Sequence, residues 1–127
     1  MINHIKTAAI YVEDQKRSLD FYIMKLGFDV YRNFPMGKEA NWIEVAPKGA
    51  QSHMVLYPKA LMSNWQELKP SIVFSSKDCE ATFRELKSRG IEFTQEPERM
   101  AWGICAKFID PDKNEFLITQ DLIQDEA

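Results

Sequence analysis

The stretch Trp102 to Gln120, WGICAKFIDPDKNEFLITQ, carries the clearest structural signal in this sequence. Residues 104–109 alternate between two faces with the two-residue period of a β-strand, and residues 116–119 are apolar and β-prone. The segment between them, 110–114, has turn chemistry, because Pro111 fixes φ for the first corner and Asn114 tolerates a left-handed conformation. The sequence therefore predicts a hairpin of two antiparallel strands.

The same order of elements is predicted twice along the chain. Each copy has a strand, a helix that begins at a capping Asp and ends at a Gly, and further strands. Asp14 to Gly27 spans thirteen residues and Asp78 to Gly90 spans twelve. The predicted strands are 5–12, 28–34, 41–46 and 53–57 in the first copy, and 71–75, one beginning at 91–94, and the two of the hairpin in the second. These spacings indicate a duplicated βαβββ unit.

Apolar side chains at helical spacing predict which face of each helix is buried. The first stripe consists of Leu19, Tyr22, Ile23 and Leu26, and the second of Cys79, Phe83 and Leu86. Because the first helix needs an apolar partner, Ile10 and Val12 should face it, so that Thr7 and Tyr11 point the other way.

The hairpin motif Asp110-Pro111-Asp112, Asn114, together with YVEDQKRSLDFYIMKLGF at residues 11–28, resembles the vicinal oxygen chelate superfamily. That superfamily includes glyoxalase I, extradiol dioxygenases, and the bleomycin and fosfomycin resistance proteins. The resemblance covers roughly residues 4 to 120. In the usual pattern a Gly occupies the place of Lys113, so this turn is expected to carry more backbone strain.

The resemblance implies an α+β fold in one domain, residues 1–127. Module one would cover about 4–58, a connector with one helical turn about 59–69, and module two about 70–120, followed by a short C-terminal tail. The two modules would form a curved, open, barrel-like sheet with the helices outside and a cavity inside.

The family's metal-ligand positions are occupied here by residues that bind divalent cations poorly. By resemblance these positions are Thr7, about Val55, Ser71 and Leu117. Two of them are apolar and two are neutral hydroxyls, whereas such ions take imidazole, thiolate or carboxylate donors. The expectation is therefore a protein with no metal and no cofactor.

His53 is the histidine with the strand parity of Val55, and three roles are open for it: a polar lining of the cavity, an exposed residue at a strand start, or a metal ligand. Without carboxylate partners of matching parity it would make a poor metal site. The acidic group Glu92, Glu96 and Glu98, which flanks Pro97, is expected to be a solvated loop.

Four aromatic residues on strands or strand edges are candidate ligand contacts: Tyr11, Trp42, Tyr57 and Trp102. Rings with a polar group suit a pocket for a flat or greasy molecule. Core packing and a dimer interface are the competing interpretations. Trp102 has the stronger functional claim by resemblance, since residues before the penultimate strand border the ligand groove in resistance proteins of this family.

Composition limits the remaining function classes. With 127 residues, 45% hydrophobic and 28% charged, the chain is an ordinary globular protein of one domain's length. Its net charge of −3 argues against nucleic-acid binding. The N-terminal segment has neither a signal peptide nor a membrane span, and isolated Cys79 and Cys105 are expected to be buried, reduced thiols. A cytoplasmic location is expected.

The function expected from the sequence is that of a metal-independent, homodimeric protein that binds a small organic molecule, similar to bleomycin-resistance-type members and serving in drug sequestration. Two alternatives remain open. One is a metal-dependent lyase or dioxygenase that uses His53 with a non-standard ligand set. The other is a non-catalytic interaction or scaffold module.

Overall fold

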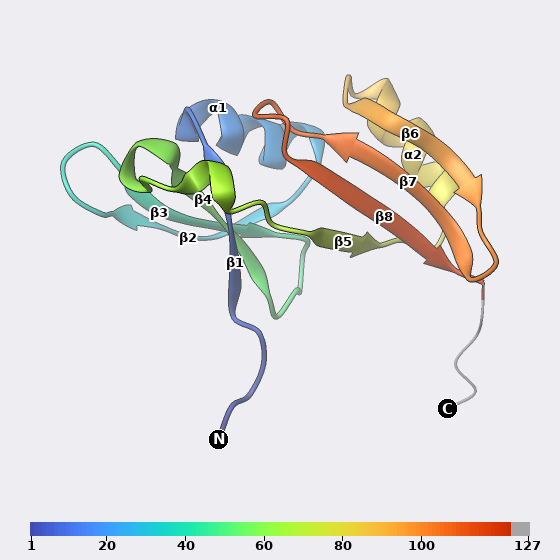
Figure 1. Ribbon diagram of the computed structural model, residues 1–127, viewed down its shortest axis with the longest axis horizontal. Helices are drawn as coiled ribbons and strands as arrows, with labels where there is room; N and C mark the ends of the chain where they lie inside the picture. Colours follow the sequence, from blue (N-terminus) through green and yellow to red (C-terminus); the bar gives the residue numbers. More distant parts are fainter. Residues whose placement is uncertain (123–127) are drawn as a thin grey trace. The chain divides into compact units, whose positions relative to one another are not determined.

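Two four-stranded mixed sheets, each accompanied by a helix, make up the computed structural model (Figure 1). The structure describes residues 1–122, and the chain divides into two units between Pro70 and Ser71. Both units have the order βαβββ, and both sheets are open. The predicted α+β class and the duplication are confirmed, whereas the single-domain organisation and the joint barrel-like sheet stay predictions.

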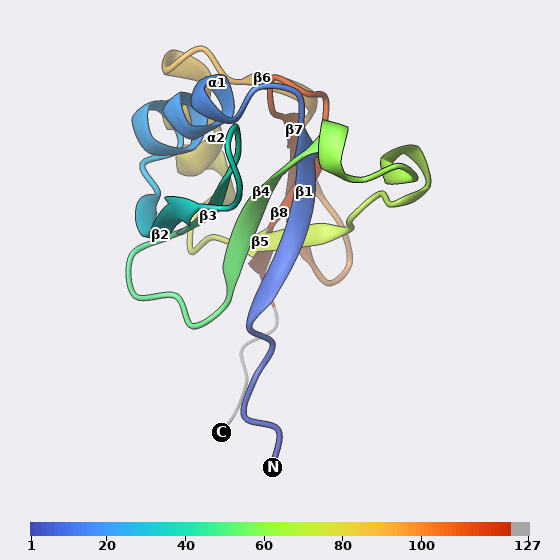
Figure 2. The ribbon, with the colours of Figure 1, turned by 90° about the vertical axis from the view of Figure 1, so that its left-hand side faces the viewer.

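The N-terminal unit has the strand order β1-β4-β3-β2. Strand β1 runs parallel to β4, and the other neighbours are antiparallel; Figure 2 shows β1 and β4 side by side. The elements of this unit are β1 (Thr7–Val12), α1 (Gln15–Asp20), the π-helical η1 (Phe21–Lys25), β2 (Asp29–Pro35), β3 (Asn41–Ala46), β4 (His53–Pro58), and the short 3-10 helices η2 (Lys59–Leu61) and η3 (Trp65–Glu67).

The C-terminal unit repeats this topology with the order β5-β8-β7-β6. Strand β5 is parallel to β8, as β1 is to β4, and the other neighbours are antiparallel. The elements of this unit are β5 (Ile72–Ser75), α2 (Cys79–Ser88), β6 (Glu92–Arg99), β7 (Gly103–Ile109) and β8 (Glu115–Asp121).

Both main helices begin and end where their capping residues predict. The Asp14 carboxylate accepts hydrogen bonds from the amides of Lys16 and Arg17, and Asp78 accepts one from Ala81. Gly27 and Gly90 then adopt φ values of 75° and 86°, a left-handed conformation that costs glycine little.

The buried faces of the two helices agree with the sequence to different degrees. In α2 the residues Cys79, Phe83 and Leu86 are buried as predicted. In the first helical segment only Tyr22 of the predicted stripe is fully buried, while Ser18 and Phe21 are buried in place of the others. Ser18, Phe21 and Tyr22 have the i, i+3, i+4 spacing of one helix face, so the buried face is offset by one residue from the start of the predicted stripe.

The core of the N-terminal unit lies on one face of its sheet. Ile10, Val12, Val45 and Leu56 are fully buried there together with Tyr22. Burial of Ile10 and Val12 agrees with the prediction that they face the first helix. Because strand residues alternate between faces, the opposite face carries the side chains described below.

The side chain of Gln15 fastens the start of α1 to the sheet. Its amide nitrogen donates to the carbonyls of Asn41 and Leu56, each at 2.7 Å, and its amide oxygen accepts from the Asn41 amide at 3.1 Å. One side chain therefore satisfies backbone groups of β3 and β4 where these two strands would otherwise leave them unpaired.

The prediction of a solvated loop around Pro97 is wrong. Residues 92–99 form β6, which pairs with β7 through a register that shifts twice. A strand beginning at 91–94 was predicted, but the low β propensity of the acidic segment hid its continuation to Arg99. An edge strand tolerates both a proline and outward charges, so pairing with β7 is sufficient to make this segment a strand.

The predicted hairpin of β7 and β8 is confirmed, and so is the backbone conformation expected at its turn. Lys113 has φ of 63°, the one positive φ outside glycine among the described residues. The Asp110 side chain is buried and accepts hydrogen bonds from the amides of Asp112 and Asn114 at 2.9 and 2.8 Å. These bonds stabilise the turn although it has no glycine at the left-handed position.

Two further expectations concern the thiols and the membrane. Cys79 and Cys105 are free and buried, as predicted, and burial raises the pKa of the Cys79 thiol. No helix within residues 1–122 is both long and apolar enough to cross a membrane.

Candidate ligand-binding face

The second face of the N-terminal sheet collects most of the candidate site residues, and we call it the Glu44 face. Strand register defines it, because residues paired across neighbouring strands share a face. The pairs are Thr7 with His53, Tyr11 with Tyr57, Ala9 with Val55, Val55 with Glu44, Glu44 with Arg32, and Trp42 with Phe34.

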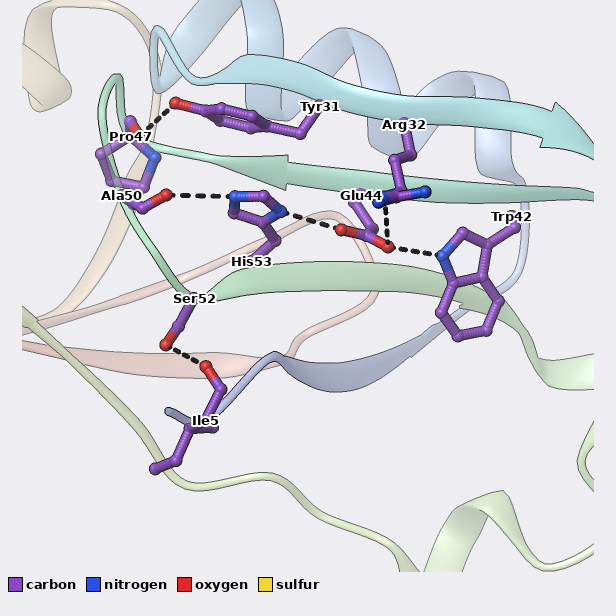
Figure 3. Close-up of polar contacts among 9 residues, drawn as sticks. All are labelled: Ile5, Tyr31, Arg32, Trp42, Glu44, Pro47, Ala50, Ser52 and His53. Atoms are coloured by element: carbon purple, nitrogen blue, oxygen red, sulfur yellow. Dashed lines mark hydrogen bonds and ion pairs between the residues drawn. The ribbon is translucent and has the colours of Figure 1, made fainter. Parts of the chain in front are cut away.

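Glu44 lies at the centre of this face and is almost completely buried, with 2% of its surface exposed. Its carboxylate accepts hydrogen bonds from Trp42 Nε1 at 2.7 Å and from His53 Nδ1 at 2.8 Å. Arg32 Nε lies 3.6 Å from the same carboxylate. Figure 3 shows the three side chains, which come from β2, β3 and β4, converging on this one group.

The environment keeps Glu44 ionised. Burial by itself raises the pKa of this carboxyl, but the hydrogen bonds from Trp42 and His53 and the charge of Arg32 act in the opposite direction, and the pKa is lowered overall. A buried carboxylate with two hydrogen-bond donors and a nearby cation is well compensated, whereas the same group without them would be strongly disfavoured.

His53 is held on both sides by acceptors. Nδ1 faces Glu44, and Nε2 lies 3.1 Å from the carbonyl oxygen of Ala50. Both ring nitrogens are therefore engaged within the cluster, and a metal ion or a substrate could reach either of them only after one of these contacts is broken.

Tyr31 packs against the flat face of this imidazole. An extra residue in β2, between Val30 and Arg32, displaces the strand register at Tyr31. The Tyr31 ring stacks on His53 with centroids 4.1 Å apart and planes at 19°. Its hydroxyl donates to the Pro47 carbonyl (Figure 3). The same hydroxyl accepts from the Gly49 amide, so the loop after β3 is fastened to the same cluster.

Four aromatic side chains lie on this face as two cross-strand pairs, and we call these four residues the aromatic row. Tyr11 and Tyr57 are cross-strand neighbours whose ring centroids lie 6.0 Å apart in an edge-on arrangement. Trp42 and Phe34 are the corresponding pair on β3 and β2. The row thus includes one residue from each strand of the sheet and combines large apolar surface with polar groups at the ring edges.

The chain matches the family described as the glyoxalase/bleomycin resistance protein/dioxygenase superfamily over residues 1–118. It belongs to this superfamily. Among curated proteins it is 47% identical to YetH of Bacillus subtilis, covering 94% of this chain and 100% of that protein.

Solved structures of the superfamily resemble the chain over nearly its whole length. A member from Sphaerobacter thermophilus is 30% identical with a TM-score of 0.85, covering 94% of this chain and 98% of its own. TnmS3, an antibiotic binding protein from Streptomyces sp. CB03234, is 31% identical with a TM-score of 0.80, covering 94% of this chain and 97% of its own.

Five of the eight candidate site residues of this superfamily member lie on the Glu44 face. They are Thr7, Tyr11, Trp42, His53 and Tyr57. The other three belong to the C-terminal unit, where Ser71 precedes β5 and is exposed, Leu117 is a half-buried residue of β8, and Trp102 precedes β7 and is 47% exposed.

Glu44 and Arg32 were missed by the sequence reasoning, and the statement that His53 lacks a carboxylate partner of matching parity is wrong. Glu44 lies in the strand NWIEVA, where it shares a face with Trp42 and Ala46. A charged residue inside such an apolar strand was the available signal, since buried carboxylates are rare unless paired. Within residues 1–122 no group of three or more His, Cys, Asp or Glu side chains could hold a metal ion.

The duplication gives the Glu44 face an internal counterpart. Across the C-terminal sheet the equivalent row is Val73, Leu117, Lys107 and Gln95, in place of Ala9, Val55, Glu44 and Arg32. A lysine thus stands at the position of the buried carboxylate. The Glu44 cluster is therefore a property of one module and not of the shared fold.

Proposed function

We propose that this protein binds a small organic molecule against the Glu44 face without a metal ion. One observation supports this most directly: the Trp42 indole, in the middle of the aromatic row, is oriented by its hydrogen bond to the buried Glu44 carboxylate. A ring held in one orientation loses little conformational entropy when a ligand packs on it, so the platform is prepared for binding.

The rest of the face fits the same role. Half-buried rings beside a few fixed polar groups are the usual composition of small-molecule sites. Thr7 and Val55, at two of the family's ligand positions, neither carry charge nor offer imidazole. Because TnmS3 is an antibiotic binding protein, we further propose that the molecule is a drug-like compound and that the protein sequesters it.

A metal-dependent lyase or dioxygenase is the alternative, and the Glu44–His53 pair is the observation that favours it. Such an enzyme would need His53 to leave Ala50 and would need ligands beyond this pair. A scaffold role without any ligand is the remaining alternative.

Two properties accompany the proposal. All seven residues of β2 are exposed, including Val30 and Phe34 at 43% and 47%, and such an edge is suited to pairing with a second copy in a homodimer. Free Cys79 and Cys105 fit a reducing compartment, which supports a cytoplasmic location.

The test begins with a thermal-shift screen of flat organic compounds, repeated in the presence of a chelator. We expect compounds that raise the melting temperature equally in both conditions. Trp42→Ala should then lose the shift, while Trp65→Ala, which changes a ring of η3 in the same unit, should retain it. Trp102→Ala shows whether that exposed ring also contacts the ligand.

Loss of binding on chelation would contradict the metal-free proposal and favour the enzyme. Binding that survives Trp42→Ala would remove the Glu44 face from the site. A screen that finds no compound would favour the scaffold role.

A further inference from the structure

We infer that the molecule bound on the Glu44 face carries an anionic group and that Arg32 recognises it, an inference that rests on the proposed function. The ligand would be a planar aromatic acid, with its rings on the aromatic row and its acidic group at the guanidinium. Arg32 is then the residue that determines specificity.

The Arg32 guanidinium has hydrogen-bond donors that the cluster does not use. Its contact with Glu44 is made through Nε at 3.6 Å, longer than a hydrogen bond, and its side chain is 55% exposed. Within residues 1–122, Glu44 is the one group that contacts this guanidinium through an ion pair or hydrogen bond. The two Nη nitrogens are therefore available, and a guanidinium binds a carboxylate through two parallel hydrogen bonds.

Glu44, in contrast, has no capacity for a cationic ligand. Trp42 and His53 already donate to its oxygens at 2.7 and 2.8 Å, and the carboxylate is 3% exposed. A ligand ammonium group would have to displace these donors and reach a buried group. The cluster thus presents a cation outward and keeps its anion covered.

The other charged groups of this face do not cancel the positive charge that a ligand would meet beside Arg32. His53 and Glu44 are paired with each other. Asp29 is the remaining charged residue, and it lies at the far end of β2, opposite Ala46 and beyond the irregularity at Tyr31. Strand β1 contributes Thr7, Ala9 and Tyr11, which carry no charge at neutral pH.

The spacing along β2 places the cation beside an apolar ring. Phe34 follows Arg32 by two residues on the same face, a separation of about 7 Å, and its cross-strand partner is Trp42. A planar ring that packs on Phe34 and Trp42 can therefore direct an attached carboxylate at Arg32. The combination of ring contact and charge defines the ligand class.

The experiment compares three probes that share one ring system: 2-naphthoate, 2-naphthamide and 2-naphthylmethylammonium. Dissociation constants are measured by isothermal titration calorimetry for the wild type, Arg32→Gln and Arg84→Gln. Arg84 is a matched control, since it is an exposed arginine on α2 with a weak contact to Glu80 at 3.8 Å.

We expect the wild type and Arg84→Gln to bind the acid at least tenfold more tightly than the amide, and the ammonium probe most weakly. Arg32→Gln should bind acid and amide equally, with its affinity for the amide unchanged. Arg32→Lys should recover part of the preference, because a lysine restores the charge but not the planar pair of donors.

Equal binding of acid and amide by the wild type would overturn the inference and leave the proposed function intact. An acid preference that persists in Arg32→Gln would also overturn it. Failure of all three probes to bind, with the variants folded as judged by circular dichroism, would contradict both.

Discussion

A carboxylate without solvent is costly, so the side chains around Glu44 have to compensate its charge. Two hydrogen-bond donors, Trp42 and His53, and the charge of Arg32 do so. Glu44 in turn orients the side chains that compensate its charge, which are an indole, an imidazole and a guanidinium. At the scale of single residues, Glu44 is thus a positioning residue, and the side chains it holds are the ones that would meet a ligand.

Glu44→Ala should lower the free energy of unfolding by about 2–4 kcal/mol, because Trp42 Nε1 and His53 Nδ1 lose a charged acceptor and a cavity remains. Urea denaturation measures the loss. Glu80→Ala is the control, since Glu80 forms an exposed pair with Arg84 on α2, and a loss of less than about 0.5 kcal/mol is expected there. Equal losses in the two variants would show that the cluster does not stabilise the fold.

The contribution of Glu44 should depend on pH with a definite sign. Its pKa in the folded chain is lowered from the ordinary value of 4.5, so between these two values the unfolded chain binds more protons. The stabilisation is therefore complete above about pH 4.5 and is lost as pH falls through the lowered pKa. The difference in free energy of unfolding between wild type and Glu44→Gln, measured from pH 7 to pH 3, should shrink only below that value. A constant difference would contradict this.

The sequence singled out Tyr11, Trp42, His53 and Tyr57 as candidates from aromatic character, strand position and, for His53, strand parity. The strand register places these four residues on one face, and their contact with a ligand stays a prediction. The central carboxylate was missed because its partnership with His53 depends on the register between β3 and β4. That register is set by pairing across residues distant in the chain, which no local pattern contains.

At the scale of elements, the parts of the chain with local chemistry were predicted well. The two helix caps and the hairpin turn depend on neighbouring residues alone. The continuation of strand β6 past Thr94 and the π-helical turn η1 were not predicted, because pairing with β7 decides the first, and no sequence signal was recognised for the second. Segments whose structure is imposed by a distant partner are those that sequence reasoning missed.

The hairpin turn offers a test of strain. Lys113→Gly should raise the free energy of unfolding by up to about 1 kcal/mol, because a residue with a Cβ pays for the left-handed conformation that Lys113 adopts. Lys48→Gly is the matched control: it is an exposed turn lysine whose φ is not positive, so glycine there brings no gain. Denaturation midpoints compare the two. A Lys113→Gly variant no more stable than wild type would mean that the turn is unstrained.

At the scale of the whole molecule, the duplication explains how one fold carries a specialised face. The two modules share their topology, yet Glu44 and Arg32 are replaced by Lys107 and Gln95 in the second. The strand framework therefore tolerates opposite charges at equivalent places. Function in this superfamily member is expected from side chains that differ between the modules.

Sedimentation equilibrium at micromolar concentration should give about twice the chain mass of 14.8 kDa, because the exposed edge strand β2 is suited to pairing with a second copy. Val30→Lys should shift the mass to one chain, and Leu61→Lys, which changes another exposed apolar residue, should not. A wild type that sediments as a single chain would contradict the homodimer.

The hydrogen bond between Trp42 and Glu44 also gives the protein a spectroscopic label of its own. An indole proton in a hydrogen bond to an ionised carboxylate, with the Nε1 and carboxylate oxygen atoms 2.7 Å apart, is deshielded, so its resonance should lie downfield of those of Trp65 and Trp102. The same proton exchanges slowly with solvent while the bond persists. Any molecule that settles on the aromatic row will move this one signal, so occupancy can be followed by nuclear magnetic resonance without attaching a dye.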